Sequence, residues 1–226
     1  MHLVLWNDDG YQKRHLVDQV AASVAEREKP ESVTKYFPSH DTTGLGGYLR
    51  IGHRINYREQ EDGIIVSGYP AEIPFLIGTS KADTICVVVN DGVNLGTDIF
   101  NSGTVLSAVQ AGWLGFRAVA VGFPRGLKKV DTDQIALIRY VMNYSPRPPM
   151  VMNVNLREKV DSTRWRFVDE LSGIRYETTV REGDGSASIH DTGKSVRGGG
   201  DGYWYELGNS TVTRLDGIFR VREIAS

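Results

Sequence analysis

The amino-acid sequence predicts an α/β protein with a mostly parallel central sheet, followed by an antiparallel β extension. Two observations carry this prediction. Up to residue 157, short apolar runs alternate with segments of helical periodicity, a pattern typical of parallel strands joined by covering helices. From residue 158 onward, aromatic and β-branched residues dominate and no helical periodicity appears. We therefore expect a core over residues 1–157 and a β-rich extension over residues 158–226.

Each strand expected in the core is a short run of apolar, often β-branched residues. Thr84–Val89 is the clearest, because it is apolar on both faces, as a central parallel strand is. The other expected parallel strands are His2–Trp6, Val33–Phe37, Ala118–Val121 and Met150–Leu156. We also expect an antiparallel pair, Tyr48–Tyr57 and Gly63–Ser67, joined by the polar loop Arg58–Asp62.

Helices are expected between these strands. Lys13–Glu28 has apolar residues at helical spacing on one face, and Lys29-Pro30 ends it. Ser102–Leu114 and Asp131–Tyr144 are likewise amphipathic. A short helix is expected over Tyr69–Ile77, since proline is tolerated in the first turn of a helix.

The extension is expected to form strands over Trp165–Thr179 and Tyr203–Val221, because aromatic and β-branched residues favour sheets. The polar, glycine-rich stretch Arg181–Gly202 favours a mobile segment or a long hairpin. We expect this region to serve oligomerisation, with Tyr203-Trp204-Tyr205 packing in an interface; stacking on a base is the alternative for these rings.

The composition excludes several classes of protein. The 226 residues carry 26 Lys and Arg against 28 Asp and Glu, so we expect no nucleic-acid polymer as a partner. No apolar run approaches the roughly 18 residues of a transmembrane helix, so we expect no membrane association. Cys86 is the only cysteine, and the amino terminus lacks the regions of a signal peptide. These features favour a cytoplasmic protein.

Ligands of parallel α/β sheets bind at the carboxyl ends of the strands. Asn7-Asp8-Asp9-Gly10 follows the first expected strand. Adjacent carboxylates repel each other, and a cation with a preference for oxygen ligands, such as Mg²⁺, Mn²⁺ or Ca²⁺, relieves that repulsion. Asp-Gly is also a common turn pair, so an ordinary turn is an equal alternative for this tetrapeptide taken alone.

Three further segments follow strands or open a helix. Thr42-Thr43-Gly44 can wrap a ligand or a metal, although a flexible loop is the simpler interpretation of that stretch alone. Asn90 and Asn94 offer amide oxygens to a metal or amide N–H groups to a phosphate. Ser102-Gly103-Thr104 opens a helix, where hydroxyl and backbone N–H groups form an anion site and where Ser102 can equally be an N-cap. Arg125 follows another strand and is either solvated or steers anionic substrates.

Together these strand ends predict a metal-dependent hydrolase of phosphate esters. Such an enzyme needs carboxylates for a cation that activates water, and donors for the charge that develops on the phosphoryl oxygens. Each segment has an ordinary explanation by itself, and the prediction depends on their combination.

The same motifs, in the same order, resemble the SurE family of stationary-phase survival proteins. They are Asn7-Asp8-Asp9-Gly10, the loop Pro38–Gly44, Gly68-Tyr69-Pro70-Ala71, the asparagine–glycine stretch Asn90–Gly96, Ser102-Gly103-Thr104-Val105 and Met152–Leu156. The resemblance implies a Rossmann-like three-layer sandwich and a metal-dependent phosphatase that hydrolyses nucleoside 5′(3′)-monophosphates by attack of a metal-activated water. It also implies one Mg²⁺ or Mn²⁺ per chain and a homodimer or homotetramer.

The resemblance implies roles for individual residues. The implied metal ligands are Asp8, Asp9, Thr43 and Asn90. Asp8 and Asp9 are also the implied catalytic residues, which orient the water or take its proton. The implied phosphate and substrate ligands are Asn94, Ser102, Gly103 and Thr104. Thr42 replaces Thr43 as the hydroxyl ligand if the loop is shifted by one residue.

The sequence departs from the family pattern near this site. Thr43 stands where serine is usual, and Val87-Val88 stands where Ser-Gly usually precedes Asn90. These departures, with the divergent extension, motivate the alternative of a non-catalytic, nucleotide-binding SurE-like paralogue; an oligomeric scaffold is a further one. A hydrolase of the haloacid dehalogenase type, with a nucleophilic aspartate, is disfavoured because its two aspartates are two residues apart, whereas Asp8 and Asp9 are adjacent.

Overall fold

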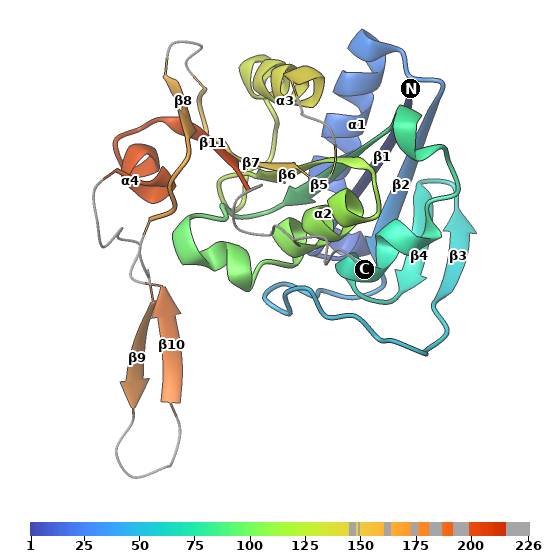
Figure 1. Cartoon of the computed structure of the whole chain (residues 1–226), viewed down its shortest axis with the longest axis horizontal. Coiled ribbons are helices and arrows are strands. Elements are labelled where there is room, and N and C mark those ends of the chain that lie inside the picture. Colours follow the sequence, from blue (N-terminus) through green and yellow to red (C-terminus); the bar gives the residue numbers. More distant parts are fainter. Residues whose placement is uncertain are drawn as a thin grey trace, which may run out of the picture.

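The computed structural model describes residues 1–144, 148, 150–160, 164–172, 176–180, 187–191 and 199–215, and nine strands of this part of the chain form one mixed sheet (Figure 1). Across the sheet the order is β3-β4-β2-β1-β5-β6-β7-β11-β8. The bounds are β1 His2–Asn7, β2 Ser32–Pro38, β3 Asn56–Gln60, β4 Gly63–Ser67, β5 Thr84–Asn90, β6 Arg117–Gly122, β7 Val151–Asn155, β8 Trp165–Val168 and β11 Ser210–Arg214. The run from β4 to β7 is parallel throughout, as the sequence predicts.

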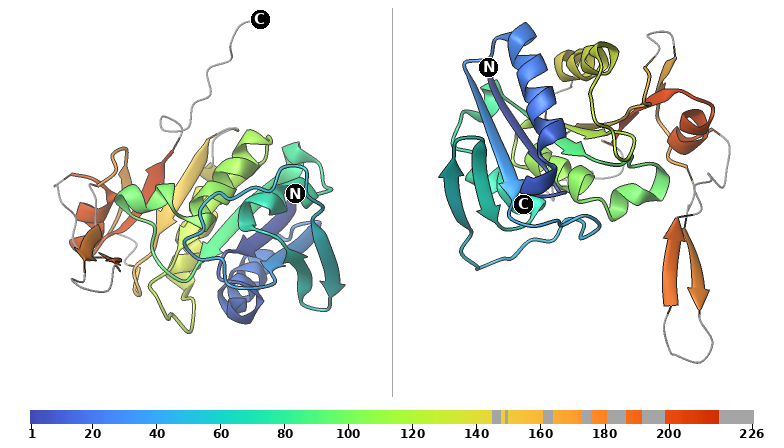
Figure 2. Two further views of the ribbon diagram at one scale, coloured as in Figure 1. Left: turned by 90° about the horizontal axis from the view of Figure 1, so that it is seen from below. Right: turned by 180° about the vertical axis from the view of Figure 1, so that it is seen from behind.

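The helices lie on both faces of this sheet (Figure 2). Their bounds are α1 His15–Glu28, α2 Gly103–Trp113, α3 Thr132–Tyr144 and α4 Asp201–Glu206, with 3-10 turns at Tyr11–Lys13, Pro70–Leu76, Lys81–Asp83 and Gly96–Phe100. Helices α1 and α3 pack on one core, and α2 with the 3-10 turn at Pro70–Leu76 packs on the other. The expected three-layer α/β architecture is therefore confirmed. Within the described residues, no helix has the length and apolar character needed to cross a membrane.

Strand β5 is apolar on both faces because each face is buried in a different core. Val87 packs in the core under α1 and α3, and Val88 packs in the core under α2. Both side chains are fully buried, as alternation along a strand requires. The bulk that Val87 and Val88 add relative to the family pattern is thus taken up by the two cores.

The register of the central strands aligns their carboxyl ends. Asn7 of β1 pairs with Val89 of β5, so Asp8 follows beside Asn90. Asn90 in turn pairs with Gly122 of β6, and Gly122 pairs with Asn155 of β7. Residues that are far apart in the sequence therefore form one row at this edge of the sheet.

The antiparallel pair near the other end of the sheet differs from the expectation. The strand expected at Tyr48–Tyr57 lies instead at β3, so part of the expected loop Arg58–Asp62 is strand. Strand β3 pairs with β4 through a tight turn, with Gln60 opposite Gly63. All five β3 side chains are exposed, so this edge strand has no apolar pattern for the sequence to reveal.

The extension also departs from the expectation of strands alone. Helix α4 occupies the start of the strand expected over Tyr203–Val221, and Asp201 in its first turn accepts hydrogen bonds from backbone N–H groups far away in the sequence. Strand β11 lies within that expected strand and pairs antiparallel with β7, a pairing with the core that the sequence did not predict, whereas β8 pairs parallel with β11 and not antiparallel. Residues 216–221 of the expected strand lie outside the described residues.

A two-stranded hairpin projects from the body (Figure 1). It consists of β9 Tyr176–Val180 and β10 Ala187–Asp191, which pair antiparallel. The long-hairpin interpretation of Arg181–Gly202 agrees with this pairing; residues 181–186 and 192–198 lie outside the described part. The division into a core and an extension at residue 157 stays a prediction, since β8 and β11 continue the central sheet beside β7.

Candidate functional site

Two adjacent carboxylates lie buried at the end of β1. Asp8 is 2% exposed and Asp9 is 4% exposed. Oδ1 of Asp8 accepts a hydrogen bond from the Thr104 hydroxyl at 2.7 Å. Oδ2 of Asp9 accepts one from the backbone N–H of Asp91 at 2.8 Å, and Lys13 Nζ lies 3.4 Å from its Oδ1. The carboxylates of Asp8 and Asp9 thus have different hydrogen-bond partners.

The electrostatic environment of Asp8 opposes a negative charge. Burial, and then the neighbouring charge of Asp9, raise the pKa of Asp8 to about 7, while the hydrogen bond from Thr104 partly counteracts them. A nearby cation would reverse this effect, because an opposite charge favours the ionised carboxylate. The site therefore has an electrostatic preference for positive charge.

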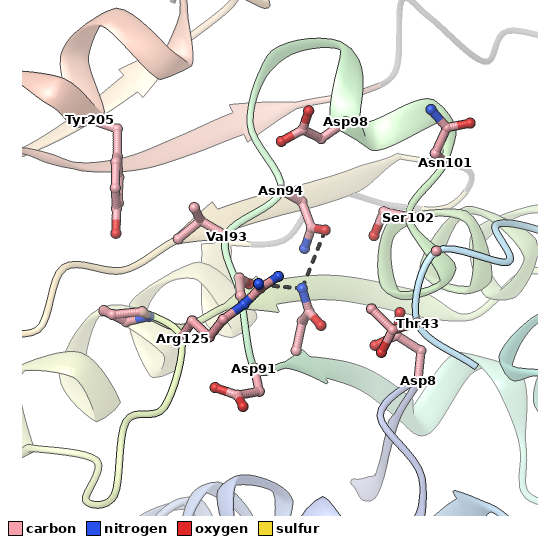
Figure 3. A pocket seen from close by; sticks show the side chains of 14 residues that line it. Asp8, Thr43, Asp91, Val93, Asn94, Asp98, Asn101, Ser102, Arg125 and Tyr205 are labelled. Atoms are coloured by element: carbon pink, nitrogen blue, oxygen red, sulfur yellow. Dashed lines mark hydrogen bonds between the residues drawn. The ribbon is translucent and has the colours of Figure 1, made fainter. Parts of the chain in front are cut away.

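Two asparagines present opposite polarity to the same space. The Asn90 amide donates to the carbonyl oxygen of Gly92 at 2.8 Å and lies 3.4 Å from Oδ1 of Asn94 (Figure 3, dashed lines). These contacts fix which amide atom is oxygen and which is nitrogen. Within the described residues, Oδ1 of Asn90 and Nδ2 of Asn94 are buried without a hydrogen-bond partner. Asn90 thus offers an acceptor suited to a cation, and Asn94 offers a donor suited to an anion.

The Asn94 loop is held by two buried side chains of β7. Asn153 and Asn155 both donate to the carbonyl oxygen of Asn94, at 2.8 and 2.9 Å, and Oδ1 of Asn155 accepts from the Asn94 N–H at 2.7 Å. The alternation Asn-x-Asn places both amides on one face of the strand. A Cβ on Gly122 would lie 2.7 Å from the carbonyl oxygen of Gly92, so only glycine leaves room for this loop. The family motif Met152–Leu156 of the sequence analysis contains these two asparagines, but the sequence did not assign them this positioning role.

The two threonines of the next loop have different surroundings. Thr42 is 1% exposed, and its hydroxyl and backbone N–H both donate to the carbonyl oxygen of Asp8, at 2.7 and 2.9 Å. The single O–H of Thr43 faces two carboxylate acceptors, Oδ1 of Asp41 at 2.6 Å and Oδ1 of Asp9 at 3.2 Å, and Thr43 lines the cavity beside Asp8. Of the two alternatives, Thr43 is the residue whose hydroxyl lies toward the carboxylates.

The segment Ser102-Gly103-Thr104 has three separate roles at the start of α2. The Ser102 hydroxyl caps the helix by accepting from the Val105 N–H at 3.1 Å, and Ser102 lines the cavity. A Cβ on Gly103 would lie 2.9 Å from Oδ2 of Asp8, so glycine lets the helix approach the carboxylate. Thr104 is fully buried and turned toward Asp8, which makes it a positioning residue for that carboxylate.

These groups surround a cavity of about 530 Å³, a size suited to a small-molecule ligand (Figure 3). The expected residues that line it are Asp8, Thr43, Asn90, Asn94 and Ser102. Asp9, Gly103 and Thr104 are not among the described lining residues, and the last two lie against Asp8. Sequence reasoning did not assign Asp98 or Asn101 to the site; it gave base stacking only as an alternative for Tyr205, and it left Arg125 open.

The donor set fits a divalent cation that prefers oxygen. Asp8, Asp9, Thr43 and Asn90 supply carboxylate, hydroxyl and amide oxygens, and the unpartnered Oδ1 of Asn90 is an acceptor that the protein itself leaves unused. In the described part of the chain, no three His, Cys, Asp or Glu residues form a metal-binding group. A cation here would thus depend on the neutral oxygens as well as on the two carboxylates.

The fold and the site define a Rossmann-like α/β protein with a paired-carboxylate and amide site at the carboxyl ends of its parallel strands. The family model of Survival protein SurE matches residues 3–176, and this chain belongs to that family. The fold also matches the crystal structure of the SurE protein from Aquifex aeolicus, with a TM-score of 0.76, 20% identity and coverage of 95% of this chain and 93% of that one.

Curated relatives extend this comparison at the level of sequence. A protein of Methylococcus capsulatus named 5′-nucleotidase SurE is 29% identical over 184 residues, which are 77% of this chain and 69% of that protein. A protein of the same name from Idiomarina loihiensis is 27% identical over 215 residues, covering 91% of this chain and 80% of that protein.

Proposed function

We propose that this chain is a metal-dependent phosphomonoesterase that hydrolyses nucleoside 5′(3′)-monophosphates. Its family and the 5′-nucleotidase name of its relatives support a nucleotidase function. The observation that carries the proposal is the opposed polarity of Asn90 and Asn94 beside the Asp8 carboxylate. An unpartnered acceptor beside an unpartnered donor suits a site that a phosphate ester shares with a cation, because buried polar groups otherwise have partners within the protein.

In the proposed site, Asp8, Asp9, Thr43 and Asn90 hold one Mg²⁺ or Mn²⁺. When bound, this ion supplies positive charge to the phosphoryl oxygens and lowers the pKa of water. The Asn94 amide and the Ser102 hydroxyl at the start of α2 donate to the phosphate oxygens, where the helix dipole also favours negative charge. Of the two adjacent aspartates, Asp8 is the one that lines the cavity, so we assign it to accept the proton of the attacking water. We also propose a cytoplasmic homodimer or homotetramer.

The proposal is tested by measuring phosphate release from a panel of nucleoside monophosphates with Mg²⁺, with Mn²⁺ and with a chelator. We expect release that depends on the metal and is lost in the Asp8→Ala variant. Nucleotide binding without phosphate release under every metal condition would instead identify a non-catalytic paralogue. A trapped aspartyl-phosphate would favour the mechanism with a nucleophilic aspartate.

A matched pair of substitutions separates the roles of the two threonines. We expect Thr43→Val to weaken the response of phosphate release to the metal by about tenfold to a hundredfold, because it removes an oxygen beside Asp9. We expect Thr42→Val to act mainly on stability, lowering the free energy of unfolding by about 1 kcal/mol through loss of its hydrogen bond to Asp8. Metal titration and urea denaturation of both variants measure these effects. A weakened metal response in Thr42→Val and an unchanged one in Thr43→Val would place the ligand at Thr42.

A further inference from the structure

Helix α4, which the sequence did not reveal, contributes Tyr205 to the wall of the candidate cavity. Figure 3 shows Tyr205 and Val93 on one side of the cavity, and Asp8, Thr43 and Ser102 on the other. Pro124 also lines this cavity. The cavity therefore combines carboxylate, amide and hydroxyl groups with an aromatic and apolar wall supplied by Val93, Pro124 and Tyr205.

The ring of Tyr205 is fixed in place. Its hydroxyl donates to the carbonyl oxygen of Leu156 at 3.0 Å, directly after β7. The guanidinium carbon of Arg157 lies 4.6 Å from the ring centroid, an arrangement typical of a cation–π contact. Arg157 is not among the described residues that line the cavity, whereas Tyr205 is. A ring held in this way loses little conformational entropy when a ligand packs on it.

The position of α4 relative to the phosphate end is fixed as well. Asp201 is fully buried, and both of its carboxylate oxygens accept from the backbone N–H of Gly96 at 3.0 Å. Its Oδ1 also accepts from the N–H of Ser172 at 2.9 Å. Gly96 lies two residues after Asn94, whose amide is the proposed hydrogen-bond donor to the phosphate. Asp201 thus ties the helix that carries Tyr205 to the loop that carries Asn94.

We propose that Tyr205 is a specificity-determining residue that packs against the nucleobase of the substrate, while the phosphate lies at the Asp8 and Asn94 end. This inference rests on the proposed function and adds the group that recognises the leaving nucleoside. A nucleoside monophosphate has a charged phosphate at one end and a planar, weakly polar ring at the other. In the cavity, Tyr205, Val93 and Pro124 offer aromatic and apolar surface to such a ring, beside the charged Arg125. Stacking on an aromatic side chain tolerates different bases because every base has a π-face.

The test compares adenosine 5′-monophosphate with ribose 5-phosphate, which has the same phosphate and sugar but no base. We expect Tyr205→Leu to lower the ratio of kcat/KM for the nucleotide to kcat/KM for ribose 5-phosphate by about tenfold. Tyr205→Phe keeps the ring and is expected to keep the wild-type ratio. Trp204→Leu is the matched control, because Trp204 precedes Tyr205 in α4 but is not among the described lining residues.

Three outcomes would overturn this inference. They are an unchanged ratio in Tyr205→Leu, an equal loss on both substrates, and an equal change of the ratio in Trp204→Leu. Equilibrium binding of the two compounds to the same variants is measured in parallel and does not require turnover. If the wild type hydrolyses neither compound, the proposed function fails, and the binding ratio alone decides whether Tyr205 recognises the base.

Discussion

The Asp8→Asn variant is expected to lose phosphatase activity and, in the absence of metal, to be more stable than the wild type. Activity should fall by about a thousandfold or more, because the variant lacks a charged ligand and the proposed proton acceptor. Stability should rise because asparagine removes a buried charge beside Asp9, while its amide oxygen can still accept from Thr104. A gain in stability with a loss of activity is the signature of a strained functional group.

The pH dependence of this gain follows from the direction of the pKa shift. The pKa of Asp8 rises from an ordinary value of 3.8 to about 7 in the folded chain, so the folded state binds the proton more tightly. The stability of the metal-free wild type should therefore fall as the pH rises from about 4 to about 7, and then level off. Asp8→Asn should lack this decline, giving it an advantage on the order of 2–4 kcal/mol at pH 8 that disappears near pH 4.

Urea denaturation at pH 4.5 and at pH 8, with a chelator present, measures this difference. Asp83→Asn is the matched control, because Asp83 is exposed and lies far from β1 in the sequence. Retained activity in Asp8→Asn, or a loss of stability at pH 8, would contradict the roles that we assign to this carboxylate.

The Asp201→Ala variant is expected to lose on the order of 3 kcal/mol of stability. The substitution leaves the backbone N–H groups of Gly96 and Ser172 buried without their acceptor, and hydrogen bonds to a charged group are among the stronger ones. Because Asp201 holds the loop that follows Asn94, we also expect KM for adenosine monophosphate to rise. Asp201→Asn keeps one acceptor oxygen and should lie between the wild type and the alanine variant.

Urea denaturation and steady-state kinetics of the two Asp201 variants test this expectation. Asp83→Ala is again the exposed control, for which a change within about 0.5 kcal/mol is expected. If Asp201→Ala behaves like that control, the carboxylate does not hold α4 on the site.

The parallel core was predictable because its signals are local. Strand β5 is apolar on both faces because Val87 enters one core and Val88 enters the other. The run of apolar residues that results can be read from the sequence. Because ligands of parallel sheets bind at the carboxyl ends of the strands, the sequence also predicts that Asp8, Asn90 and Ser102 lie near one another, and all three line the same cavity.

The features that were missed either lack a local apolar pattern or depend on contacts between distant residues. Strand β3 has only exposed side chains, so no apolar period marks it. Helix α4 has only six residues and is held by Asp201 on Gly96, which are 105 positions apart. The hydrogen bond from Thr104 to Asp8 likewise depends on how α2 packs against the end of β1, and no local sequence pattern predicts that packing.

The most direct test of the account is the initial rate of phosphate release from adenosine monophosphate as Mn²⁺ is titrated into chelator-treated protein, with Asp8→Asn measured in parallel. We predict that the wild-type rate rises from near zero and saturates with one cation per chain, while the rate of Asp8→Asn stays near zero at every Mn²⁺ concentration. A wild-type rate that is the same with chelator as with Mn²⁺ would contradict the claim that Asp8, Asp9, Thr43 and Asn90 form a metal-dependent phosphatase site.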